Sequence, residues 1–164
     1  MIYGNFNDLE IIKIAISMEE EGMNFYTSGA KYTSGKLRDF LLHAAGQEMA
    51  HKEKFTRLYN EFLEKKNGFN DEYLFEPDVA AYLKSMVENQ VFSKKPKTDD
   101  AFKDLKTAVA DAVQAEETTA ALYTQMYEGA KYQEVKNVLA ILIEEEKEHA
   151  KYFKGILEEI SKQS

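Results

Sequence analysis

Two short motifs in this sequence each place a histidine three residues after a glutamate. Glu48 and His51 form the first pair, and Glu146 and His149 form the second pair, 98 residues later. Residues three apart lie on the same face of an α-helix, so each pair can offer a carboxylate oxygen and an imidazole nitrogen to one metal ion. One such pair is a weak signal in a glutamate-rich chain. Two pairs at the same place in an internal repeat are a strong one.

Two more glutamates belong to the same repeat. The segments around Glu19 and Glu116 share the pattern Ala-hydrophobic-x-x-Glu-x6-Tyr, at an offset of 97 residues, and their tyrosines are Tyr26 and Tyr123. The sequence therefore predicts two helical hairpins of one design, each with a glutamate on its first helix and Glu-x-x-His on its second. Pseudo-twofold symmetry would bring six groups together: Glu19, Glu48, His51, Glu116, Glu146 and His149.

Four long helices are predicted to position these groups, because apolar residues recur at helical spacing along most of the chain. The predicted helices cover residues 8–30, 36–66, 99–130 and 134–161. Asn7 or Asp8 is the expected N-cap of the first helix, and Thr98 or Asp99 that of the third. Each helix would be about 35–48 Å long at 1.5 Å per residue.

The second and third helices are separated by a long connection, residues 67–98, with a short predicted helix from Pro77 to about Gln90. A connection of this length can return the chain to the other end of the bundle, which makes the second and third helices parallel. The predicted fold is therefore an all-α, ferritin-like four-helix bundle with one long crossover.

Each apolar stripe is interrupted near its middle by a side chain that can bind metal. Glu146 and His149, for example, lie between Leu142 and Phe153 on the stripe of the last helix. Four carboxylates buried together would each carry a desolvation penalty of several kcal/mol, and two divalent cations would cancel their charge. The alternatives are a solvated helix face and a metal-free buried polar network, but a solvated face should not lie on an apolar stripe.

The donor set indicates which metals to expect. Carboxylates with one imidazole per metal and no thiolate favour iron or manganese over structural zinc. The sequence has no cysteine, which excludes disulfides, iron–sulfur clusters and four-cysteine iron sites within it. We expect two iron ions, with manganese or a mixed pair as the alternative. Coordination positions left open would accept oxygen, peroxide or water.

Several polar residues near the six groups are expected to have other roles. Tyr26 and Tyr123 share a face with the glutamates two turns away, and we expect their hydroxyls to hydrogen-bond the opposite carboxylates. His43 is rotated off the core stripe and is not expected to bind metal. The remaining neighbouring glutamates are expected on the surface: Glu20, Glu21, Glu117, Glu144, Glu145 and Glu148.

Length, composition and charge limit the other possibilities. The 164 residues suit one domain, residues 1–164, and a net charge of −8 with a pI near 5.0 disfavours binding to nucleic acid or anionic membranes. Residues 1–12 lack a basic patch followed by an apolar stretch, and the longest apolar run, residues 138–143, is too short to span a membrane. We therefore expect a cytoplasmic protein.

The paired Glu-x-x-His and Glu-x6-Tyr motifs resemble those of the rubrerythrin branch of the ferritin-like superfamily, and the resemblance spans all four predicted helices. It implies that Glu19, Glu48, His51, Glu116, Glu146 and His149 bind two irons. It also implies a non-haem oxidoreductase that reduces hydrogen peroxide or oxygen, takes electrons from an external donor such as a rubredoxin-like protein, and forms a homodimer.

The sequence departs from that family at two points. It lacks the four cysteines of a rubredoxin domain, and Thr119 stands where the family usually has a second glutamate, three residues after Glu116. The second departure bears on the peroxidase activity rather than on metal binding. Two other functions fit the same residues. One is a ferroxidase or iron-binding protein for storage or delivery, and the other is a bundle whose metals are purely structural.

Overall fold

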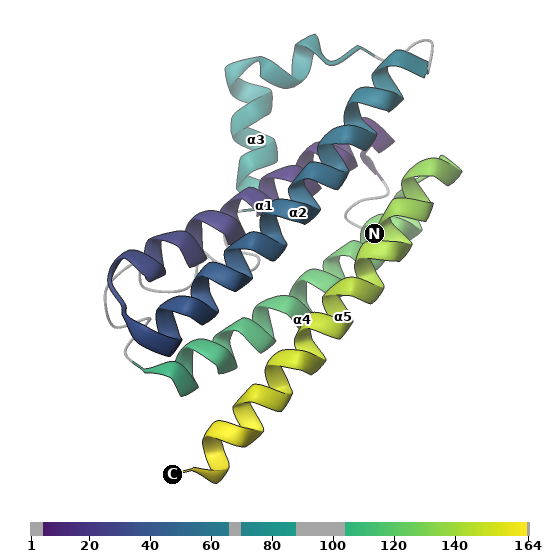
Figure 1. The fold of residues 1–164 in the computed structure, drawn as a ribbon. Helices are drawn as coiled ribbons and strands as arrows, with labels where there is room; N and C mark the ends of the chain where they lie inside the picture. The colour runs from purple at the N-terminus through teal and green to yellow at the C-terminus, as the bar shows by residue number, and fades with distance from the viewer. Residues whose placement is uncertain (1–4, 66–69, 88–103, 164) are drawn as a thin grey trace.

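A computed structural model of the chain describes residues 5–65, 70–87 and 104–163 (Figure 1). Within these ranges the chain forms α-helices and one short 3-10 helix, without β-strands, which confirms the predicted all-α class. The elements are α1 (Asp8–Lys31), α2 (Gly35–Lys65), η2 (Glu72–Phe75), α3 (Pro77–Val87), α4 (Leu105–Gly129) and α5 (Gln133–Lys162). Across the described ranges, no helix is both long enough and apolar enough to span a membrane.

The helix ends follow from local hydrogen bonding. Asn7 is the N-cap of α1 and forms a capping box with Glu10, in agreement with one of the two predicted caps. Helix α4 begins at Leu105 rather than near residue 99, because the Asp104 carboxylate caps it through the Thr107 N–H at 2.7 Å. The predicted caps at 98 and 99 lie outside the described residues, as do the last three residues of the short helix predicted to end near residue 90.

The four long helices form two hairpins, α1 with α2 and α4 with α5, which pack side by side (Figure 1). Helix α2 runs antiparallel to α5, since the Phe40 ring contacts that of Phe153 at one end and Phe62 contacts Tyr132 at the other. Helix α4 is in turn antiparallel to α5, so α2 and α4 are parallel. The connection that contains η2 and α3 spans the bundle between them, which is the predicted crossover topology.

The start of α1 is tied to the turn between α4 and α5. The buried Asp8 carboxylate accepts hydrogen bonds from the backbone N–H of Lys131, at 2.9 and 3.1 Å, and of Tyr132, at 2.8 Å. These charge-assisted bonds join residues that lie far apart in the sequence. They set how the two hairpins are aligned along the bundle axis, and therefore which residues face each other at mid-length.

The apolar core falls into two clusters. One lies toward the α4–α5 turn and includes Leu9, Phe55 and Leu139; the other lies toward the α1–α2 turn and includes Phe40 and Phe153. The buried polar residues on the helices are concentrated between these clusters, at mid-length. The bundle therefore has an apolar layer at each end and a polar layer in the middle.

Replacing Asp8 with alanine is expected to lower the free energy of unfolding by about 1.5–3 kcal/mol, because two partly buried backbone N–H groups would lose a charged acceptor. Urea denaturation followed by circular dichroism measures this change. Glu128→Ala, which removes an exposed carboxylate from the same end of α4, is the control and should change stability by less than about 0.5 kcal/mol. Equal effects of the two substitutions would contradict the structural role of Asp8.

Candidate metal centre

The six residues singled out by the repeat converge in the polar layer. Each of the four long helices contributes at least one of them, and all are buried except His149, which is partly buried. Two sets have possible ligand atoms within 4.8 Å of one another. The first set is His51, Glu146 and His149, and the second is Glu48, Glu116 and Glu146. Glu146 belongs to both sets, so its carboxylate lies at the centre of the cluster.

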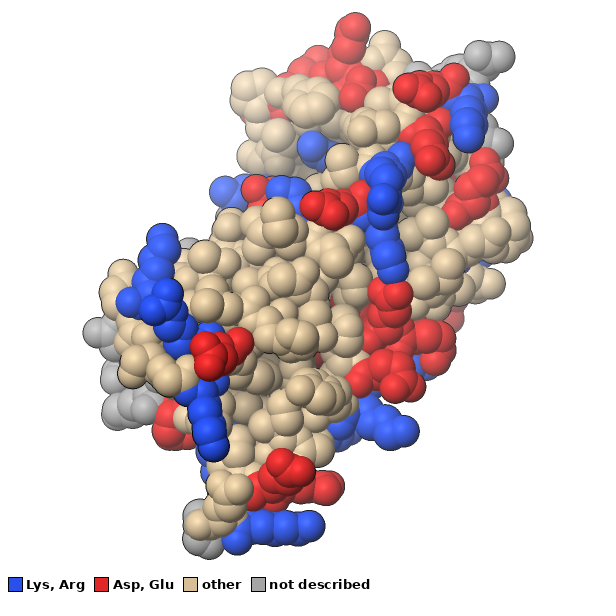
Figure 2. Space-filling view, viewed as in Figure 1, with Lys and Arg blue, Asp and Glu red and all other residues tan. Residues whose placement is uncertain are grey.

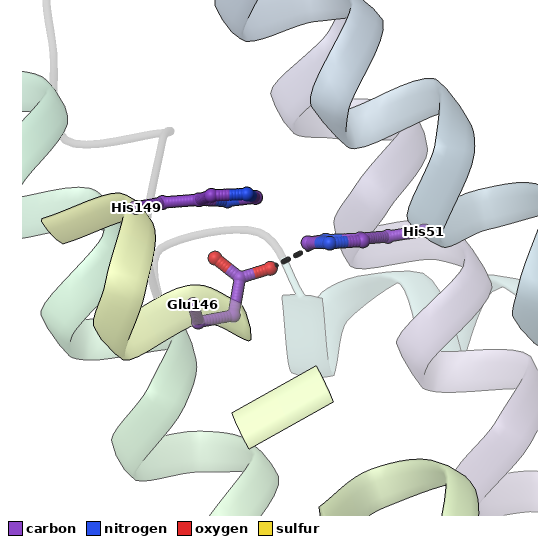
Figure 3. Close-up of side chains that lie close together, drawn as sticks. All are labelled: His51, Glu146 and His149. Atoms are coloured by element: carbon purple, nitrogen blue, oxygen red, sulfur yellow. Dashed lines mark ion pairs between the residues drawn. The ribbon is translucent and has the colours of Figure 1, made fainter. Parts of the chain in front are cut away.

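His51 on α2 faces Glu146 and His149, which both lie on α5 (Figure 3). His51 Nδ1 lies 2.6 Å from Glu146 Oε1 and 3.5 Å from Glu19 Oε1. The two imidazole rings are nearly parallel, with an interplanar angle of 10° and centroids 5.2 Å apart. His149 Nδ1 lies 3.9 Å from Glu116 Oε2, which places the last carboxylate next to the second ring. The structure thus brings all six residues together.

Burial makes the carboxylates of this cluster difficult to ionise without a counter-charge. Burial raises the pKa of Glu19 to about 8, and the charge of Glu146 adds to the effect. The pKa of Glu48 is raised well above its ordinary value by burial and by the charge of Glu19. Burial also raises the pKa of Glu146, although His51 partly offsets the shift. Positive charge placed among these groups would therefore be strongly stabilising.

The pKa values of the two histidines are shifted in opposite directions. Burial opposes protonation of His51, but the hydrogen bond and charge of Glu146 outweigh it and raise the pKa of His51. For His149, burial and the charge of His51 lower the pKa to about 4. At neutral pH, His149 is thus a neutral imidazole, the form that binds metal ions.

Several buried polar atoms of the cluster have no hydrogen-bond partner among the described residues. They include both carboxylate oxygens of Glu116, Glu19 Oε2, Glu146 Oε2 and Nδ1 of His149. Most buried polar atoms in proteins are hydrogen-bonded, so a group of unsatisfied acceptors facing one another needs an explanation. A divalent cation accounts for it, since carboxylate and imidazole atoms are ligands that iron and manganese accept. The residues present fit a metal centre.

The tyrosines of the repeat are both buried beside the carboxylates. The Tyr123 hydroxyl donates a hydrogen bond to Glu19 Oε1, across the interface between the two hairpins, as expected from the sequence. Tyr26 is buried at the equivalent position of the other hairpin, and burial, together with the charges of Glu48 and Glu146, raises the pKa of its hydroxyl. Thr119, at the position where the sequence departs from the rubrerythrin pattern, is also buried.

The expectation about Glu145 was incomplete. Its side chain is partly exposed at the surface, as predicted, but it also reaches across to α2, where its Oε2 is 3.0 Å from His51 Nε2 and its Oε1 is 2.7 Å from Lys54 Nζ. Burial opposes ionisation of Glu145, but the hydrogen bond from Lys54 lowers its pKa below the ordinary value. Helical spacing gives the direction of a side chain from its own helix and not the reach to a neighbouring helix, so the sequence pattern missed this contact.

The other neighbours lie largely where they were expected. Glu20, Glu117, Glu144 and Glu148 are exposed, and Glu21 is half-buried. His43 is exposed, away from the cluster, with its Nε2 3.3 Å from Gln47 Nε2.

A surface cavity of about 450 Å³ connects the cluster with solvent between α2 and α5. His51 and His149 form part of its wall, together with Gln47, Lys54 and the acidic residues Glu144, Glu145 and Glu148. Figure 2 shows acidic side chains gathered over the middle of α5. Small molecules and cations can therefore approach the two imidazoles from this side.

Comparison with known proteins gives one match. The sequence model of a protein family described as Rubrerythrin matches residues 10–157, which include all six residues of the cluster. No curated protein and no solved structure matches the chain.

The metal-free protein is expected to lose stability as the pH rises from about 6.5 to 8. Glu19 has a pKa of about 8 when folded and an ordinary value of 4.5, so over this range the folded state binds the proton and the unfolded state does not. Raising the pH then favours unfolding. The depressed pKa of His149, about 4 against an ordinary 6.5, acts in the opposite direction only at lower pH.

Thermal melts in the presence of a chelator, at several pH values in this range, would test this expectation. Glu19→Gln should weaken the dependence without abolishing it, because the pKa values of Glu48, Glu146 and His51 are also raised. Glu20→Gln, at an exposed neighbour, should leave it unchanged. A melting temperature that stays constant or rises over this range would show that the cluster does not hold protons in the way described.

Proposed function

The chain belongs to the rubrerythrin family, and from this premise we propose that it is a di-iron oxidoreductase that reduces hydrogen peroxide or oxygen. Membership of the family indicates a di-iron, oxidoreductase-type protein. The choice of oxidant and the role of each residue are our proposal. The observation that supports it best is the convergence of four buried carboxylates and two imidazoles, with several of their atoms unsatisfied, around Glu146.

The contacts of the two histidines suggest how the residues would be shared. Glu146 belongs to both sets of possible ligands and would serve both metal positions. Glu48 shares a helix face with His51, and Glu116 Oε2 lies 3.9 Å from His149 Nδ1, so these pairs would complete the two positions, with Glu19 on the His51 side. A pair of ferrous ions bound there would supply the two electrons that, with two protons, convert one hydrogen peroxide molecule into two water molecules.

The protein's own residues would control water, protons and ligand orientation. The apolar clusters on both sides keep solvent away from the carboxylates, so the oxidant would enter through the cavity beside His51 and His149. Tyr123 holds one oxygen of Glu19 by its hydrogen bond, which fixes the orientation of that carboxylate. Carboxylates with raised pKa values are suited to take up and release protons near the reacting oxygen atoms.

Each turnover would need two electrons from an external donor. The sequence has no cysteine and hence no rubredoxin-type iron site within these 164 residues. We propose a rubredoxin-like protein as the donor. The acidic surface beside the cavity would favour a donor that presents positive charge.

Metal analysis tests the first part of this proposal. Protein purified without chelators is expected to contain about two irons per chain, as in other two-metal carboxylate sites. The double variant Glu48→Ala/Glu146→Ala should lose most of this iron, because it removes the shared carboxylate and one other ligand. Glu144→Ala/Glu148→Ala removes the same charge from exposed positions and should keep the iron. Equal iron content in the two double variants would refute the assignment of the site.

Anaerobic stopped-flow mixing of the ferrous protein with hydrogen peroxide tests the reaction itself. We expect the bound iron to be oxidised roughly tenfold or more faster than free ferrous ion, equivalent to about 1.4 kcal/mol of the barrier. Parallel mixing with oxygen would identify the preferred oxidant. If two irons are bound but neither oxidant reacts faster than with free iron, the metals are structural and the proposed activity is wrong.

A further inference from the structure

The two histidines of the cluster are held in different ways. The difference lies at Nε2, which in His51 faces Glu145 at 3.0 Å; Nδ1 of His51 points into the cluster, 2.6 Å from Glu146. Glu145 is in turn held by Lys54 at 2.7 Å. Among the described residues, the Nδ1 atoms of both histidines lack a hydrogen-bond partner, but only His51 has a carboxylate beside its Nε2. The His149 side chain is also 19% exposed, against 5% for His51.

The internal repeat shows that this difference is encoded in the sequence. The 98-residue offset that relates His51 to His149 also relates Gln47 to Glu145 and Lys54 to Tyr152. By the pseudo-twofold arrangement, Gln47 and Tyr152 stand where a second carboxylate–lysine pair would support His149. Instead, Gln47 Nε2 lies 3.3 Å from His43 Nε2, and the Tyr152 ring is exposed with its centroid 6.3 Å from that of His43. The Glu145–Lys54 pair beside His51 therefore has no counterpart beside His149.

We propose that Glu145, held in place by Lys54, is a positioning residue for His51, and that the His51 half of the site consequently binds its metal ion more tightly than the His149 half. This inference rests on the proposed function, because it assumes that both histidines bind metal.

The physical reason is the state of the imidazole. A carboxylate that accepts a hydrogen bond from Nε2 fixes the tautomer in which Nδ1 carries the lone pair, and Nδ1 is the atom that points into the cluster. It also makes Nδ1 more basic and restricts rotation of the ring. Lys54 keeps the carboxylate charged and in place, since its Nζ contacts the Glu145 oxygen that His51 does not use.

Burial acts in the same direction. His51 is more deeply buried than His149, so metal at its position exchanges less readily with solvent. His149 faces the cavity, and its Nδ1 lies 3.9 Å from Glu116, but among the described residues no carboxylate supports its Nε2. The two positions should then fill in order, the His51 position first and the His149 position last. The second ion should be the more easily lost.

Titration of the full-length, metal-free protein with Co²⁺ tests this inference. Equilibrium dialysis gives the two affinities, and the visible absorption bands of bound Co²⁺ report the environment of each ion. We expect two binding steps in the unmodified protein. Glu145→Gln should weaken the tighter step about 10–100-fold and shift its absorption bands. Glu144→Gln removes a neighbouring charge that does not contact either histidine, and should leave both steps unchanged.

A second variant tests the same idea by adding a carboxylate instead of removing one. Gln47→Glu places a carboxylate at the position that corresponds to Glu145 in the repeat. It should tighten the weaker binding step by up to about 10–100-fold. Gln133→Glu, the same change at an exposed position at the start of α5, is its control and should have no effect.

The outcomes separate this inference from the proposed function. If two ions bind with equal affinity, or if Glu145→Gln behaves like Glu144→Gln, the positioning role is wrong while the two-metal site stands. If Gln47→Glu has no more effect than Gln133→Glu, the explanation of the difference between the two halves fails. A protein that binds no metal overturns both the inference and the proposed function.

Discussion

The structure depends on one costly arrangement, the burial of four glutamates at the middle of an apolar helical bundle. Glu19, Glu48, Glu116 and Glu146 are almost completely inaccessible to solvent, and apolar clusters enclose them on both sides. Such a layer contributes little stability by itself, because ionised carboxylates in a low-dielectric interior are desolvated and repel one another. Cations or protons must balance the charge. The raised pKa values of Glu19 and Glu48 mean that protons can neutralise these carboxylates in the metal-free protein. The proposed irons would neutralise them in the metal-bound protein.

The rest of the bundle holds this layer in alignment. Each hairpin supplies half of the cluster, so a small shift of one hairpin along the other would separate the carboxylates from the imidazoles. The contact of Asp8 with the α4–α5 turn and the Phe40–Phe153 pair at the opposite end prevent such a shift. Tyr123 adds a hydrogen bond between the hairpins at the layer itself. The apolar packing at the two ends of the bundle therefore stabilises the fold, and the buried carboxylates at its centre destabilise it.

The near-symmetry of the two hairpins makes their differences informative. A symmetrical site would give two equivalent metal positions, and the repeat alone would lead to that expectation. The Glu145–Lys54 pair on one side, opposed by Gln47 and Tyr152 on the other, breaks the symmetry around the six residues while leaving the six proposed ligands themselves symmetrical. Both imidazoles line the cavity, and the more exposed of the two belongs to His149.

The sequence by itself determined the all-α class, the crossover topology and the six residues of the cluster, because helical periodicity is local and a polar residue on an apolar stripe is visible without coordinates. It did not place the start of α4, since Asp104 competes with earlier residues as a cap and local hydrogen bonding decides between them. It also missed the contact of Glu145 with His51. That contact depends on the distance between α2 and α5 and on the reach of a long side chain, which only the packing of one helix against the other fixes.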